Sequence, residues 1–144
     1  MAVKRHADDV ILTVLDYYTA LSADTANWVV NWAGFYVVDP AALDQLILGP
    51  FQGKAACQTI KFGVGVCGTA AATKGTQVVP DVRAYPGHIA CDGDTQSEVV
   101  VSIVCDGRVV AVLDIDCLVK DVWDDEDERY LELLAQQISA SCAW

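Results

Sequence analysis

The sequence predicts an α+β domain in which helices pack against a single, mostly antiparallel sheet. Three observations lead to this fold class. Apolar residues recur at helical spacing near both ends of the chain, runs rich in β-branched and aromatic residues lie between them, and Asp106-Gly107 separates two such runs as a hairpin turn does. With 144 residues, 53% of them hydrophobic, the chain is expected to form one domain over residues 1–144.

Helices are expected in three places. Residues 8–22 carry apolar side chains at helical spacing, and the alanine-rich residues after the glycines of 63–75 predict a short helix that stops at Gly75. The last helix should begin after Asp124, a suitable N-cap. Its apolar stripe consists of Leu131, Leu134, Ala135, Ile138 and Cys142.

Six strands are expected between these helices. They cover residues 28–38, 44–51, 56–62, 76–82 (ended near Pro80), 98–104 and 108–116. Residues 84–97 form a loop that is longer than most connections, and long ordered loops in small domains are commonly functional.

The register of the last two strands decides whether three acids share one face. Asp114 and Asp116 are two residues apart and point to the same side of a strand. A two-residue turn would place Glu98 opposite Ile115, on the other side. We therefore predict a three-residue turn with Gly107 in the left-handed position and Glu98 opposite Asp114; a bulge elsewhere would serve equally. If no cluster forms, the strand end has simply reached solvent.

The net charge of −11 argues against binding to nucleic acids or to anionic membranes, which both require clustered basic residues. No apolar run approaches the roughly 18 residues of a membrane span. The opening residues, MAVKRHADDV, are not expected to form a signal peptide, because two aspartates follow the basic residues and no clear cleavage site comes after them. We therefore expect a cytoplasmic protein.

The six cysteines are expected to be reduced in that compartment, where disulfides are typically catalytic or redox-sensing. Cys105, Cys117 and Cys142 lie beside a turn, on an apolar strand face and on an apolar helix stripe, so they are interpreted as packing residues. Cys57, Cys67 and Cys91 lie at loops or loop–strand junctions instead.

Two of these loop cysteines suggest specific chemistry. Cys67 is close to a predicted helix start, where the helix dipole would stabilise a thiolate, and Cys91 lies in the long polar loop. An alternative is a zinc site made by His88 with Cys57, Cys67 and Cys91. Its spacing matches no common zinc motif, and it leaves the acids unexplained, so His88 is interpreted as a loop anchor.

Seven short motifs occur in order along the chain. They are NWAGFY (31–36), LGPFQGKAAC (48–57), GVGVCGTAAAT (63–73), VPDV (79–82), YPGHIACD (85–92), SEVVV (97–101) and VLDID (112–116). Together they resemble the free methionine-(R)-sulfoxide reductases, which are GAF-domain enzymes. The resemblance implies a single GAF domain with a central antiparallel sheet, helices on one face and a ligand pocket on the other.

The resemblance also implies roles for eight residues. These are Cys91 as the catalytic thiol, Cys57 as the main resolving thiol, Cys67 as a second one, Glu98, Asp114 and Asp116 as active-site acids, and Trp32 and Tyr36 as aromatic contacts of the S-methyl group. Where the family commonly has proline, serine and phenylalanine, this chain has Ser102, Cys117 and Trp123, none of them at a matched chemical position.

The implied chemistry is consistent with these residue types. A thiolate attacks the sulfoxide sulfur and becomes a sulfenic acid, a second thiol converts it to a disulfide, and thioredoxin restores the thiols, so that no metal or cofactor is needed. Clustered acids cannot all ionise. Glu98 and Asp116 are jointly assigned to proton transfer. The acids of the cluster that are ionised, Asp114 included, are assigned to binding the ammonium group of a free amino acid. The sequence is compatible with a homodimer and does not determine the oligomeric state.

The alternative function is a non-catalytic GAF module that binds a small molecule or senses oxidation. Such modules usually accompany an output domain, which is not expected within these residues.

Overall fold

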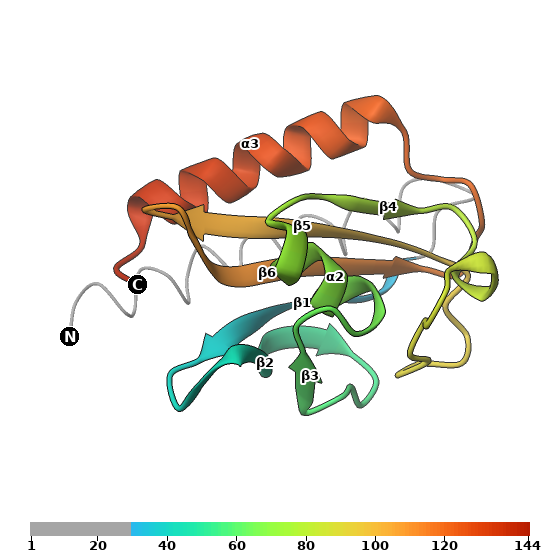
Figure 1. Cartoon of the computed structure of the whole chain (residues 1–144). Coiled ribbons are helices and arrows are strands. Elements are labelled where there is room, and N and C mark those ends of the chain that lie inside the picture. The colour runs from blue at the N-terminus through green and yellow to red at the C-terminus, as the bar shows by residue number, and fades with distance from the viewer. Residues whose placement is uncertain (1–29) are drawn as a thin grey trace.

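The computed structural model describes residues 30–144, drawn in colour in Figure 1. The helix expected at 8–22 lies outside the described residues. The elements are β1 (Val30–Asp39), β2 (Ala42–Gly53), β3 (Thr59–Lys61), α2 (Gly65–Thr73), β4 (Gln77–Val79), the 3₁₀ turn η1 (Val82–Ala84), β5 (Ser97–Cys105), β6 (Arg108–Cys117) and α3 (Asp125–Ser141).

These strands form one six-stranded antiparallel sheet in the order β3-β2-β1-β6-β5-β4. Figure 1 shows α3 lying across one face and α2 on the opposite side of the strands. The predicted α+β class, with a central antiparallel sheet, is confirmed. Of the helices within residues 30–144, α3 covers the face away from the pocket and α2 lies on the pocket side.

The face under α3 forms one hydrophobic core. Leu131, Ala135 and Ile138 of α3 pack onto apolar side chains of β1, β5 and β6, with Leu134 and Cys142 at the margin, as the helical spacing predicts. Asp124 caps the helix: its carboxylate accepts the backbone N–H groups of Glu126 and Asp127.

The turn between β5 and β6 differs from our prediction. Cys105 pairs with Arg108, so the turn has two residues, and both Asp106 (φ 49°) and Gly107 (φ 77°) adopt positive φ, as a type I′ turn requires. The register shifts further along, because Ile103 pairs with Ala111 while Val104 pairs with Val109. The extra residue is Val110, and this bulge brings Glu98 opposite Asp116 rather than Asp114.

Helix α2 lies close to the sheet because its inward side chains are small. Cys67, Ala70 and Ala71 are buried, and Ser102 of β5 donates a hydrogen bond to the carbonyl of Ala70 at 2.8 Å. A Cβ added at Gly68 would collide with the backbone carbonyl oxygen of Lys61. The start of α2 therefore tolerates no side chain at that position.

In the part of the chain described here, neither helix combines the length and the apolar composition that crossing a bilayer would need.

The Gly68→Ala substitution is expected to lower the free energy of unfolding by about 2 kcal/mol, because the new methyl group meets fixed backbone. Gly75→Ala is the matched control, since its Cβ would meet atoms no closer than 3.5 Å. Urea titration of both variants checks the difference. Equal stability of the two variants would contradict the close approach of α2 to Lys61.

Candidate active site

The pocket face of the sheet carries its polar side chains in two neighbouring cross-strand rows. In the first, Trp32 of β1 pairs with Asp116 of β6, which pairs with Glu98 of β5. In the second, Gly34 pairs with Asp114, which pairs with Val100. Cross-strand partners share a face of the sheet, so the three acids form one cluster, as predicted.

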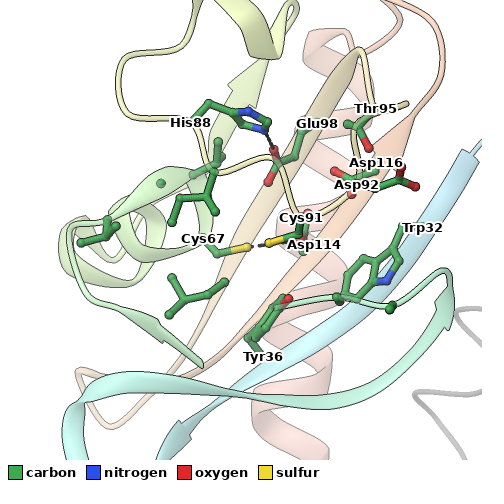
Figure 2. A pocket seen from close by; sticks show the side chains of 17 residues that line it. Trp32, Tyr36, Cys67, His88, Cys91, Asp92, Thr95, Glu98, Asp114 and Asp116 are labelled. Carbon is green, nitrogen blue, oxygen red and sulfur yellow. Dashed lines mark hydrogen bonds and ion pairs between the residues drawn. The ribbon is translucent and has the colours of Figure 1, made fainter. Parts of the chain in front are cut away.

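A pocket opens above these rows, and the acids line it together with residues from α2 and the loop before β5 (Figure 2). The wall of the pocket also contains Trp32, Tyr36, Cys67, His88, Cys91 and Thr95. Seven of the eight residues implied by the motifs therefore line one pocket, and the eighth, Cys57, is bonded to Cys91.

The acids are buried in a way that disfavours their charged forms. Glu98 and Asp114 are each only 6% exposed. Burial raises the pKa of Glu98, Asp114 and Asp116 well above the usual carboxyl range, and each has a second carboxyl nearby that raises its pKa further. The cluster therefore retains protons at pH values where exposed carboxyls have lost theirs.

The environment of Cys67 differs from the one that we expected. Its side chain is buried at the start of α2 and donates its S–H to Oδ2 of Asp114 at 3.2 Å. Burial first, and the nearby Asp114 second, raise the pKa of this thiol well above its usual value. The prediction of a thiolate stabilised by the helix start is wrong, because desolvation and adjacent carboxyls outweigh the dipole.

His88 belongs to the loop that carries Cys91 and reaches the acid cluster. Its Nε2 atom lies 3.5 Å from Oε2 of Glu98 (Figure 2). Burial lowers the pKa of His88 while it raises the pKa of Glu98, so the contact joins two groups that both favour their neutral forms. This geometry agrees with an anchoring contact between the loop and β5.

Cys57 and Cys91 form a disulfide, so the structure represents an oxidised form of the protein. Cys91 is exposed in its loop, whereas Cys57 is half-buried between β2 and β3. The zinc set of His88 with three cysteines is not assembled here, because two of its sulfur atoms are bonded to each other. Within residues 30–144, ligand atoms close enough for a metal ion occur only at Cys67, Glu98 and Asp114.

Aromatic side chains build the apolar wall of the pocket. Trp32 stacks on Tyr36 with ring centroids 5.9 Å apart and on Phe51 at 5.5 Å. The Tyr36 hydroxyl donates to the backbone carbonyl of Cys57 at 3.1 Å, which ties this wall to the disulfide. Burial raises the pKa of Tyr36 above its usual range, so the hydroxyl stays a donor.

Sequence reasoning missed the residues that hold the cysteine loop. The side chain of Asn31 contacts Asp92 and Thr95, which follow Cys91 in the loop. Asn31 and Asp92 lie inside quoted motifs, but contacts over 61 and 64 residues of chain leave no periodic signal.

The comparisons with known proteins agree with this architecture. A family model described as GAF domain matches residues 9–142. The free methionine-R-sulfoxide reductase of Saccharomyces cerevisiae is 48% identical over 158 residues, covering 95% of this chain and 88% of that protein. The chain is thus a GAF-domain protein.

Two solved structures narrow this class. The free methionine-R-sulfoxide reductase from Neisseria meningitidis, in complex with its substrate, has a TM-score of 0.78 and 40% identity, covering 96% of this chain and 85% of that one. The reduced form of the Staphylococcus aureus fRMsr has a TM-score of 0.77 and 41% identity, covering 99% and 94%. The chain belongs to the free methionine-R-sulfoxide reductase family, which is a family of enzymes.

The buried acids make stability depend on pH. Because folding raises their pKa values, the folded protein holds protons that the unfolded chain has lost above about pH 4. The free energy of unfolding should therefore fall as pH rises from 5 to 8, by at most about 1.4 kcal/mol per pH unit for each proton. Asp114→Asn should flatten this decline, as measured by denaturation of the disulfide form.

Asp106→Asn is the matched control, because it removes the same charge from an exposed turn that tolerates asparagine. A decline that is equally steep in Asp114→Asn and in Asp106→Asn would contradict the protonated state of the cluster.

Proposed function

We propose that the protein reduces free methionine-R-sulfoxide to methionine. The observation that carries this proposal is the Cys57–Cys91 disulfide beside a pocket that holds three buried acids and an aromatic wall. Two relatives whose sequences are 48% identical to this chain are named for this activity, and one similar solved structure is a reductase in complex with its substrate.

Cys91 is the proposed nucleophile because it is the exposed member of the pair and also lines the pocket. Its thiolate attacks the sulfoxide sulfur while a carboxyl proton reaches the oxygen. The oxygen ends on Cys91 as a sulfenic acid, and methionine leaves with two more electrons. The Cys57 thiol then attacks the sulfenic sulfur, which forms the disulfide and releases water.

The acids supply the proton and recognise the substrate. Glu98 and Asp116 are the proposed catalytic acids, because burial next to other carboxyls keeps a proton available. Together with Asp114 they also offer negative charge to the substrate ammonium. A methionine sulfoxide within a peptide has no such ammonium, so this pocket favours the free amino acid.

The aromatic wall is the proposed site of the S-methyl group, which packs against Trp32 and Tyr36. The R configuration would then place the oxygen toward the carboxyls and the lone pair of the sulfur toward Cys91. An external dithiol protein, thioredoxin, reduces the Cys57–Cys91 disulfide by exchange in the cytoplasm. Thiols supply both electrons, so the proposal needs no resident cofactor or metal.

Turnover tests the function. We expect NADPH consumption with thioredoxin and thioredoxin reductase when free L-methionine-R-sulfoxide is added. The S epimer and the N-acetylated R epimer should give at most about one hundredth of that rate, because each loses a contact to buried polar groups. Absence of turnover with all three, in folded and reduced protein, would overturn the proposal and favour a sensing GAF module.

Cysteine variants separate the roles of the two thiols. Cys91→Ser should abolish methionine formation. Cys57→Ser should release one methionine per protein in a single turnover yet lose most of its steady-state rate with thioredoxin, unless Cys67 replaces the resolving thiol. Cys142→Ser is the matched control, because this free thiol lies at the C-terminal end of α3, against the core on the face away from the pocket. Activity that survives in Cys91→Ser would move the nucleophile to another cysteine.

A further inference from the structure

Strand β1 contacts the segments that carry both members of the disulfide, Cys57 and Cys91. The hydroxyl of Tyr36 donates to the backbone carbonyl of Cys57 at 3.1 Å. Nearer the start of the strand, the side chain of Asn31 contacts two residues that follow Cys91 in its loop. The two cysteines are separated by 34 residues of chain, and β1 is thus a third segment that joins their surroundings.

A β-bulge directs Asn31 toward this loop. The pairing of β1 with β6 shifts between Val30 and Trp32, so Asn31 is an extra residue in β1. In a regular strand Asn31 would share the face of Ala33 and Phe35, which point into the core under α3. The bulge frees its side chain from that core, and bulges near active sites commonly redirect a side chain in this way.

The redirected amide of Asn31 holds the loop at two points. Its Nδ2 atom donates to Oδ2 of Asp92 at 3.2 Å and to Oγ1 of Thr95 at 3.0 Å. The opposite amide orientation would face the Asp92 carboxylate with a carbonyl oxygen, so the hydrogen bonds determine the orientation. Oδ1 of Asp92 in turn accepts the backbone N–H of Asp94 at 3.0 Å. The residue directly after Cys91 is therefore fixed through both of its carboxylate oxygens.

A second contact reaches the same loop from the connection between β2 and β3. Lys54, three residues before Cys57, forms an ion pair with Asp94. Its two side chains are 68% and 64% exposed, so solvent screens the pair and it contributes little. The part-buried contacts of Asn31 are therefore the stronger restraint on the residues after Cys91.

The order of this loop in the reduced protein decides how readily the disulfide forms. With both thiols reduced, no covalent bond joins the two segments, and forming the bond costs the conformational entropy of whichever segment is free. Contacts that already fix the Cys91 loop relative to β1 lower this cost, because they raise the effective concentration of one thiol at the other. Side chains that touch neither substrate nor sulfur can therefore determine the equilibrium of the cysteine pair.

We propose that Asn31 is a positioning residue that holds the loop of Cys91 against β1 when both thiols are reduced, within reach of Cys57. Tyr36 holds the Cys57 segment on the same strand. When the Cys57 sulfur bonds to the sulfenic sulfur of Cys91, the sulfenic hydroxyl leaves as water with the thiol proton. The inference rests on the proposed function for its biological role, but the thiol–disulfide equilibrium needs no methionine sulfoxide and is measured separately from turnover.

The Asn31→Asp substitution tests this role, since it keeps the shape of the side chain but sets a carboxylate against Asp92. The reaction is oxidation of Cys57 and Cys91 by glutathione disulfide, which takes up two electrons and two protons and becomes two glutathione thiols. We expect its equilibrium constant to fall about 10-fold, as loss of a hydrogen bond to a charged group predicts, which is about 30 mV for a two-electron couple. Thiol trapping with peptide mapping of the Cys57–Cys91 bond measures it.

A second variant tests the other end of the frame. Tyr36→Phe keeps the ring and removes only the hydroxyl that donates to the Cys57 carbonyl. We expect the same equilibrium constant to fall about 5-fold, as loss of a neutral hydrogen bond predicts. This variant also keeps the proposal testable should Asn31→Asp fail to fold.

Rescue and a matched control separate positioning from a general loss of stability. The double variant Asn31→Asp/Asp92→Asn exchanges donor and acceptor between the two positions, so it should return the equilibrium constant to within about 2-fold of wild type. Gln45→Leu is the control, because the Gln45 amide also donates to an aspartate, Oδ2 of Asp39 at 3.2 Å, but beside the turn between β1 and β2. It should leave the constant within about 2-fold of wild type.

The proposal is overturned by an unchanged equilibrium constant in Asn31→Asp and Tyr36→Phe. A fall that the double variant does not reverse, or one of equal size in Gln45→Leu, would overturn it as well, because the contact with Asp92 would then not be the cause. The expected pattern of constants in a protein without any turnover would confirm the positioning role and overturn the proposed function alone.

Discussion

The site depends on the pairing register of β5 with β6. Side chains alternate between the two faces of a strand, so a shift by one residue would exchange the faces completely. Val99, Val101 and Ile103 must face α3 to form the core, and this requirement turns Glu98 toward the pocket. In β6, Leu113 and Ile115 turn Asp114 and Asp116 to the same side. Apolar packing on one face of the sheet thus places the acids together on the other face. Burying the carboxyl groups costs free energy, which the packing of the apolar face offsets.

The same burial explains why the two proposed redox thiols lie in connections rather than on the sheet. Cys67 shares the desolvated pocket floor with Asp114, and burial raises its pKa, so it is a poor nucleophile at neutral pH. Cys91, by contrast, is exposed in a long loop. A loop thiol can meet a substrate, a second thiol and an external dithiol in turn, whereas the acids stay fixed on strands.

Much of this arrangement could be predicted from the sequence, but not all of it. Periodicity located the stripe of α3, and the spacing of Asp114 and Asp116 placed both acids on one face. The resemblance of the motifs indicated the Cys57–Cys91 pair. The turn length was wrong, because the bulge at Val110 sits within a run of valines that carries no bulge signal. The raised pKa of the Cys67 thiol depends on burial by residues that are distant in the sequence, so the residues around Cys67 in the chain do not predict it.

The aromatic wall illustrates how a residue without a side chain can determine a site. Gly34 lies between Trp32 and Tyr36 on the pocket face, and it pairs with Asp114 on one side and Phe51 on the other. A Cβ at Gly34 would come within 2.5 Å of both the Trp32 ring and the Cβ of Phe51. The indole of Trp32 can therefore lie over the strand and stack on both Phe51 and Tyr36 only because Gly34 has no side chain. The apolar wall beside the acids thus depends on an absent side chain as much as on the aromatic rings.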